Sequence, residues 1–315
     1  MPCLILNRRT VCLGLLALAA APRPALAIPD ILAPDAPSLA TPSLATPNLA
    51  VPATPATALP LSQLDQTIEA MRLQSALAHE VPHLVTRSPT SDANWIALAR
   101  AELARANTVL DHPQLLVVVD RSPRVQQLAI VLATPSDAPP NTWRVIGGTH
   151  VSTGSMGRFD HYITPRGVFH VTPAILGFRA EGTLNENGIR GLGAKGMRVW
   201  DFGWQIAAKG WKPDTGKPDR TPIRLMLHAT DPDKLEQRIG QPASQGCIRI
   251  PTAMNRFLDH HGVLDAEYER AATTEIRFRA LLPHDRDPSS LAGNTLIVVD
   301  SSDKSSVNMA SRNIP

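Results

Sequence analysis

The chain has 315 residues and a formal net charge of +3, with 43% hydrophobic and 19% charged residues. This length and apolar share suit one large domain or two small ones, and they exclude a wholly disordered chain. Aromatic residues make up only 4%, whereas the 29 prolines indicate that some segment lies outside the folded part.

The first 27 residues have the composition of an export signal. Arg8 and Arg9 form a basic start, residues 11–21 form an apolar run, and Ala25-Leu26-Ala27 matches a small-residue cleavage site. The run is too short to span a bilayer, which takes about 20 residues. We therefore predict a periplasmic or otherwise exported protein with a signal peptide at 1–27 and no transmembrane segment after cleavage. The export route and the oligomeric state stay open.

Without these residues the chain carries 28 basic and 28 acidic side chains. Such a balance gives no electrostatic reason to expect nucleic acid as a partner. The following segment, 28–60, is rich in Pro, Ala and Thr and repeats the phrase Ser-Leu-Ala-Thr-Pro. Proline at that density prevents helices and sheet ladders, so 28–60 is predicted to be an extended linker.

Residues 61–112 are predicted to form a helical N-terminal region. In the first helix Ser62 and Asp65 are placed as a cap pair, and an apolar face is expected at Leu61, Leu64, Ile68 and Met71. After breaks at Pro82 and Pro89, a second helix is expected to begin near Asp92. Its expected apolar face consists of Ile96, Ala99, Leu103, Ala106 and Leu110.

The body of the protein, 113–283, is predicted to be mainly β with a few helices. The expected strands are 115–119, 126–132, 143–152, 167–172, 223–230, 275–281 and 295–299. One helix is expected at 252–261, ended by Gly262. The glycine-rich stretch 177–220 has few apolar runs and is expected to be a lid, and residues 284–315 are expected to form a C-terminal extension.

Cysteine usage singles out one residue. Cys3 and Cys12 leave with the predicted signal, so Cys247 alone would enter an oxidising compartment. It then has no partner for an intrachain disulfide and no second thiolate for a Cys-x-x-Cys zinc site. Cys247 is therefore either a small buried core residue or a nucleophile.

The residues around Cys247 favour the nucleophile. Gly246 permits a tight turn whose free N–H groups can receive an oxyanion, and the helix expected from 252 would place its N-terminal dipole near the thiol and favour thiolate. His228 ends an apolar strand and is the candidate base, because the loop 229–246 can return the chain to it. Arg249 is placed to neutralise a substrate carboxylate or to brace the loop.

Four segments in this order resemble the catalytic domain of the L,D-transpeptidases of the YkuD type. They are 151–154, 164–169, His228-Ala229-Thr230 and the block 240–249, which ends in Ser244-Gln245-Gly246-Cys247-Ile248-Arg249. The resemblance covers about 115–265. Two positions depart from the family pattern: Gln245 stands where the family has His, and Ala229 replaces the usual Gly or Ser.

The resemblance implies a domain of β-sandwich-like mixed sheets and a thioester mechanism without metal or cofactor. Cys247 would attack an L,D-peptide bond in a peptidoglycan stem peptide, and His228 would take the thiol proton. Backbone amides of Gly246 and Cys247 would hold the oxyanion, with Ser244, Gln245 and Arg249 completing the oxyanion and substrate site. An acceptor amine or water would release the acyl group.

Three functions stay open at this point. The first is transfer to an amine; the second is hydrolysis by the same thioester, as an L,D-carboxypeptidase or by release of a wall-attached protein. The third is a non-catalytic wall-binding module. The expected lid carries Lys195 and Arg198 as solvated or carboxylate-binding charges. It also carries aromatic residues that either cover the thioester or plug a small core, namely Trp200, Phe202, Trp204 and Trp211.

Overall fold

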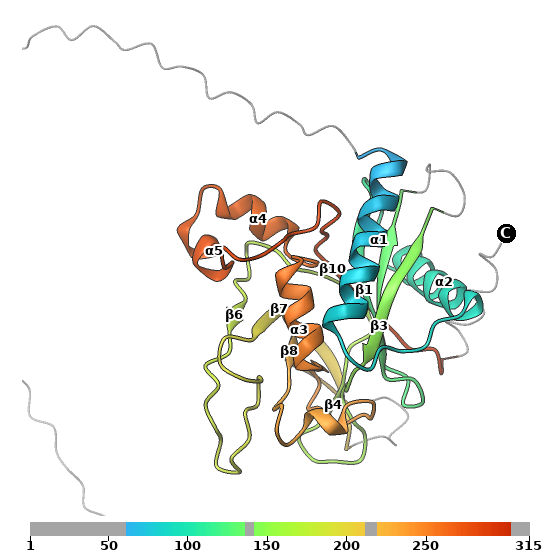
Figure 1. Cartoon of the computed structure of the whole chain (residues 1–315). Coiled ribbons are helices and arrows are strands. Elements are labelled where there is room, and N and C mark those ends of the chain that lie inside the picture. Colours follow the sequence, from blue (N-terminus) through green and yellow to red (C-terminus); the bar gives the residue numbers. More distant parts are fainter. Residues whose placement is uncertain (1–60, 136–141, 212–218, 304–315) are drawn as a thin grey trace, which may run out of the picture. The chain divides into compact units, whose positions relative to one another are not determined.

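Sheet A, the first of two sheets, forms from apolar runs that the sequence marks as strands. The computed structural model describes residues 61–135, 142–211 and 219–303, shown in Figure 1. In sheet A the order β3-β2-β1-β10-β5 joins β1 (Gln114–Asp120), β2 (Gln127–Ala133), β3 (Arg144–His150), β5 (Gly167–His170) and β10 (Thr295–Val299). The β1–β10 pair is parallel and the other pairs are antiparallel. The predicted signal peptide and linker lie outside the described residues.

Sheet B carries the candidate site. Its order is β4-β7-β8-β9, with β6 also paired to β7, and its strands are β4 (Tyr162–Ile163), β6 (Phe178–Arg179), β7 (Arg198–Lys209), β8 (Arg220–Ala229) and β9 (Ile248–Ile250). β8 and β9 pair in parallel. A parallel pair needs a crossover connection, which here is the segment 230–247 with a short 3-10 helix η1 (Glu236–Arg238).

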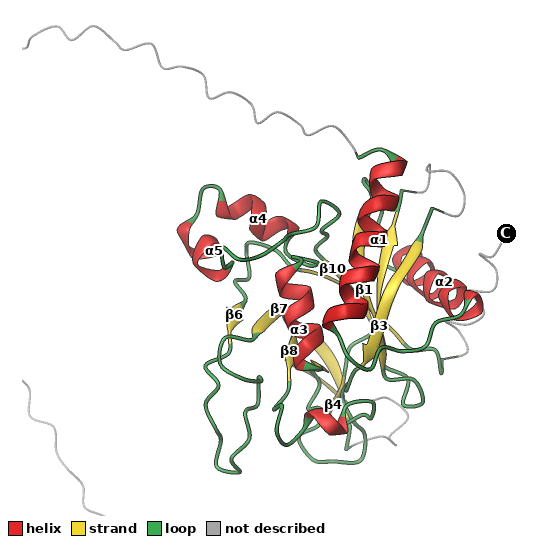
Figure 2. Cartoon of the chain, viewed as in Figure 1, coloured by secondary structure: helices red, strands yellow, loops and turns green. Residues whose placement is uncertain are grey.

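Helices cover both faces of sheet A. α2 (Pro89–Arg105) packs with Ala99 and Leu103 against one face. The other face packs against α1 (Gln63–Glu80), sheet B and α3 (Thr252–His260), which share one apolar core. Because β1 is buried along its whole length, its sequence is continuously apolar instead of alternating. The remaining helices are α4 (Ala266–Ala272) and α5 (Ile276–Leu281), near β6 and β7 in Figure 2.

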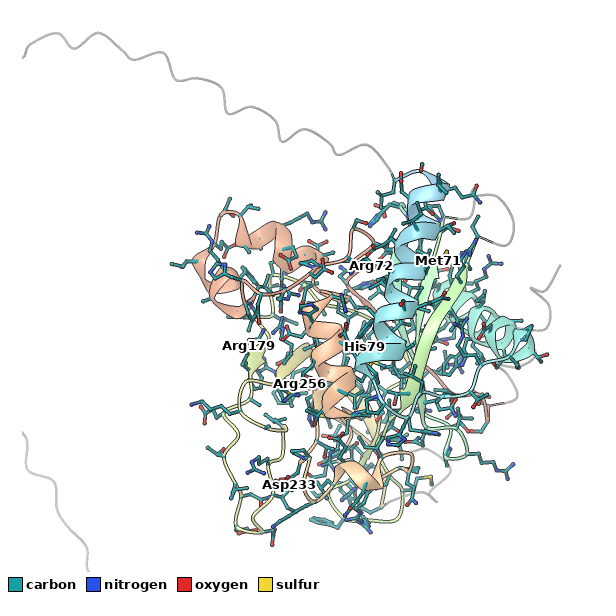
Figure 3. The ribbon with its side chains drawn as sticks, in the orientation of Figure 1. Met71, Arg72, His79, Arg179, Asp233 and Arg256 are labelled. Atoms are coloured by element: carbon teal, nitrogen blue, oxygen red, sulfur yellow. The ribbon has the colours of Figure 1, made fainter. Side chains whose placement is uncertain are left out.

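The cap predicted for α1 is confirmed, because Ser62 accepts a hydrogen bond from the backbone N–H of Asp65. The apolar face predicted for this helix is wrong except for Leu61, which packs against the core. The buried residues are Ala70, Leu73 and Leu77. Leu77 packs so closely on β3 that a Cβ at Gly147 would lie 2.5 Å from it. The exposed large side chains are instead Leu64, Ile68 and Met71, the last labelled in Figure 3.

The prediction of a mainly β protein is only loosely met. The described structure is mixed α/β, with about 27% strand, 26% helix and two mixed sheets. The predicted strand 275–281 is helix α5, in which Phe278 and Leu281 are buried three positions apart. The boundary at 283 is also wrong, because β10 lies between β1 and β5 in sheet A. The helix expected at 252–261 is confirmed as α3, and Gly262 follows it with φ +59°.

The glycine-rich stretch 177–220 is not one continuous loop. Its second half contains β7, and Trp200 and Phe202 belong to the main core. Trp204 is 67% exposed, which excludes the core-filling alternative for that residue. Arg198 is fully buried and therefore not a solvated charge. What remains is the loop 180–197 between β6 and β7, which Figure 2 shows extending away from both strands.

No helix in the described part of the chain is long and apolar enough to cross a membrane.

Candidate active site

Cys247 lies immediately before β9, at the end of a turn that only glycine can form. Gly246 has φ +127°, and a Cβ there would lie 2.7 Å from the Ile223 side chain. The carbonyl oxygen of Gly246 accepts a hydrogen bond from Thr164 Oγ1 at 2.8 Å. The thiol is half-buried, and its Sγ lies 3.6 Å from the carbonyl oxygen of Arg224 in β8. The turn therefore holds the sulfur against β8.

His228, the candidate base, is held in a defined tautomer. Its Nδ1 lies 2.6 Å from the carbonyl oxygen of Ala229, and because a carbonyl oxygen only accepts, Nδ1 carries the proton. Nε2 is then the unprotonated nitrogen, as a general base requires. The replacement of Gly or Ser by Ala at 229 does not matter for this contact, because the backbone supplies the acceptor.

Strand register places Arg249 beside His228 on one face of sheet B. His228 pairs with Arg249 across the parallel β8–β9 ladder, so their side chains share a face. Leu227 and Ile248, the preceding pair, both belong to the core on the opposite face. Cys247 itself precedes β9 in a bend, and its Sγ lies 3.6 Å from the carbonyl oxygen of Arg224, four residues before His228 on β8.

The segments 151–154 and 164–169 both contact the cysteine turn. Ser152 and Arg249 exchange backbone hydrogen bonds of 2.9 Å in both directions. The carbonyl oxygen of Thr153 accepts from the backbone N–H of Ser244 at 3.0 Å, and Thr164 Oγ1 accepts from the backbone N–H of Gly154 at 2.8 Å. All four sequence segments that carried the resemblance are therefore neighbours in space.

Ser244 and Gln245 differ in exposure: the first side chain is buried and the second is exposed. Ser244 is fully buried: its Oγ donates to the carbonyl oxygen of Cys247 at 2.5 Å and accepts from the backbone N–H of Gly246 at 3.1 Å. The Ser244 side chain thus fixes the turn, and the Gly246 N–H already has a partner inside the protein. Gln245 is exposed and lines a cavity beside the turn.

The thiol of Cys247 is not activated in the way the sequence suggested. Burial raises its pKa, and the partial compensation comes from the Met226 backbone N–H and from Arg249. The expectation that the α3 dipole favours thiolate is therefore wrong for the free protein, because desolvation outweighs the favourable charges. At neutral pH the thiol is protonated, so attack requires a base that removes its proton.

His228 is neutral at the same pH. Its pKa is lowered to about 4, mainly by burial and to a smaller extent by Arg249, while the hydrogen bond to the Ala229 carbonyl opposes the shift. A neutral imidazole can accept a proton, whereas imidazolium cannot. The free site therefore combines a neutral thiol with a neutral base instead of a preformed ion pair.

This shift predicts a pH-dependent stability. In the unfolded chain His228 titrates near its ordinary value of about 6.5, whereas in the folded protein it titrates at about 4. The folded state binds fewer protons between these values, so stability is lost as the pH falls through this window. Relative to His228→Gln, we expect the wild type to lose roughly 2–3 kcal/mol between pH 7.5 and pH 4.5. Urea unfolding of both proteins at each pH measures this difference. The same change in unfolding free energy with pH for both proteins would contradict it.

Arg249 lines a cavity of about 470 Å³ beside the cysteine turn. The cavity is bounded by residues of the turn, of the crossover 230–247 and of the loops 158–161 and 185–191, whereas Cys247 and His228 are not part of its wall. Burial lowers the pKa of the Arg249 guanidinium, although Cys247 opposes this effect. Arg249 therefore stands between the thiol and the cavity.

Sequence reasoning missed His161 and the pair Asp201–Arg224. His161 Nδ1 lies 2.7 Å from Ser155 Oγ and 3.0 Å from the carbonyl oxygen of Ser244. The buried carboxylate of Asp201 accepts from Arg224 Nε at 2.6 Å beside the thiol. An isolated His in a loop and polar residues in a strand carry no sequence signal for this placement.

Within the described ranges, no group of three or more His, Cys, Asp or Glu side chains is arranged to hold a metal ion. Comparison with known proteins finds no family model and no curated protein that matches this chain.

Proposed function

We propose that the protein is an exported cysteine L,D-transpeptidase, a β-sandwich-like domain that acts on peptidoglycan stem peptides through a thioester on Cys247. The observation that supports this most directly is that the half-buried Cys247 thiol lies against β8, the strand that also carries His228 with an unprotonated Nε2. The match of residues 151–154, 164–169 and 228–249 to the family pattern supports the same function.

The proposed reaction has two steps. His228 Nε2 removes the thiol proton while Sγ bonds to the carbonyl carbon of an L,D-peptide bond. The C–N bond then breaks, and the same proton passes from His228 to the leaving D-alanine amine. An acceptor amine next attacks the thioester, the C–S bond breaks, and His228 returns the amine's proton to sulfur.

Oxyanion stabilisation in this proposal falls mainly to the backbone N–H of Cys247. The Gly246 N–H donates to Ser244 Oγ, so it would serve only if that contact weakens on acylation. Preorganised N–H donors of this kind contribute about 10²–10³-fold to acyl transfer. The Ser244 side chain acts by holding the turn, and the loop 180–197 replaces the longer expected lid.

The test is intact-mass spectrometry of the mature protein after incubation with a purified stem tetrapeptide. We expect a mass increase equal to the tripeptide acyl group, and no increase for Cys247→Ser. Absence of the adduct in the wild type would contradict the thioester. Analysis of the released peptides then assigns the second step: cross-linked dimers support transfer, shortened stems alone support hydrolysis, and unaltered stems support the binding module.

A further inference from the structure

Two residues that line the cavity beside the cysteine turn each have a buried polar atom without a hydrogen-bond partner among the described residues. The atoms are Arg249 Nε and Thr230 Oγ1, and both residues line the cavity. Thr230 is only 1% exposed. Leaving a buried donor unpaired costs free energy of about 1–3 kcal/mol, so such groups signal a ligand that would pair with them.

The charge of the cavity indicates the sign of this ligand. Arg158 and Arg238 line it together with Arg249, and none of its described lining residues is Asp or Glu. Within the described chain, no carboxylate forms an ion pair with any of these three arginines. Two acidic residues of the crossover accept hydrogen bonds elsewhere: Asp231 from the backbone N–H groups of Arg190, Asp233 and Lys234, and Glu236 from the backbone N–H and hydroxyl of Thr252.

The size of the cavity suits a ligand larger than a lone inorganic ion. A volume of about 470 Å³ is in the range of sites that hold small organic molecules. Thr230 is buried and Arg249 is half-buried with a buried Nε, whereas Arg158 and Arg238 are exposed. Anionic groups at both ends of one ligand match this distribution, because guanidinium groups bind carboxylates through paired hydrogen bonds.

We propose that this cavity is a recognition site for a short peptide with at least two free carboxylates, one bound by Arg249 and Thr230 and the other by Arg158 and Arg238. The assignment deepens the proposed function, on which it rests for the choice of a stem peptide as the ligand. Under this proposal the site recognises the carboxylate charges of the peptide and not its backbone alone.

Binding is measured by calorimetry on a Cys247→Ala background, where no thioester forms. The probes are the stem tetrapeptide with free carboxylates, the same peptide with its carboxylates amidated, and inorganic phosphate. We expect amidation to weaken binding by about tenfold or more, since hydrogen bonds to charged groups have energies of this order. Equal affinity of the two peptides, or equal affinity of phosphate, would overturn the proposal.

Variants locate the site. Thr230→Val keeps the shape but removes the hydroxyl, and Arg158→Gln with Arg238→Gln removes the exposed charges without touching buried structure. Each variant is expected to lower the affinity for the peptide with free carboxylates several-fold and to leave the affinity for the amidated peptide unchanged. The matched control is Arg256→Gln, an exposed arginine on α3 (Figure 3) outside the cavity. If the control weakens binding as much as the variants of Arg158 and Arg238, the site is not this cavity.

The two proposals fail separately. Carboxylate-dependent binding that maps to Thr230 and the exposed arginines of the cavity, without an acyl adduct on the wild type, would contradict the transpeptidase and leave the recognition site standing. An acyl adduct on the wild type together with unchanged peptide binding in all cavity variants would support the transpeptidase and contradict the recognition site.

Discussion

Replacing His228 with Gln is expected to slow acylation of Cys247 by about 10²–10⁴-fold, the range over which a positioned general base contributes. The thiol pKa is raised by burial, so little thiolate forms without a base. His228 is buried with Nδ1 on the Ala229 carbonyl, and a glutamine amide can donate to the same oxygen but cannot accept a proton at neutral pH. The rate of adduct formation by intact mass measures the effect.

His170→Gln is the matched control for this experiment. His170 is an exposed histidine of β5 in sheet A, so its replacement should leave the acylation rate unchanged. A His228→Gln protein that acylates at the wild-type rate would show that another group removes the proton.

Replacing Asp265 with Ala is expected to destabilise the folded protein by about 3–5 kcal/mol, as the loss of one partner from a buried ion pair does. The Asp265 carboxylate is fully buried and accepts from Arg198 Nη2 at 3.2 Å, Trp200 Nε1 at 3.0 Å and Arg286 Nη2 at 2.6 Å. Without it, Arg198 keeps its charge inside the protein beside β7. Chemical unfolding at pH 7 measures the loss.

Glu267→Ala, on the same helix, gives the comparison. Among the described residues, Glu267 forms its one ion pair with the exposed Arg270, and surface pairs of this kind contribute about 0–1 kcal/mol. Similar losses for Asp265→Ala and Glu267→Ala would contradict a special role of the buried network.

In sheet A, β1, β2 and β10 could be predicted because their sequences are mostly continuous apolar runs that are buried on both faces. β7 escaped prediction because its sequence includes Arg198, Asp201 and a glycine at a bulge. These polar residues are tolerated by ion pairs with distant parts of the chain, which no local pattern reveals. The alternation of apolar and charged residues in 276–281 is typical of a strand, yet tertiary packing of Phe278 makes it a helix.

The candidate site also has a part that could be predicted from the sequence and a part that could not. Cys247, Gly246 and His228 stand in a recognisable sequence context, so their proximity could be predicted. The cavity beside them is assembled from Arg158 on one loop and from Thr230 and Arg238 on the crossover 230–247. Its position depends on how sheet B folds, and the pKa directions depend on burial, so neither was accessible from spacing.

The position of β10 has a consequence for the order of folding. β10 is the last described strand, yet it joins β1, the first, to β5. Sheet A therefore stays divided into two pieces until residue 299 has been synthesised, and contacts between such distant residues form late. For a chain that we propose to be exported, this arrangement delays completion of the sheet until nearly the whole polypeptide is available, so that a translocating chain stays unfolded.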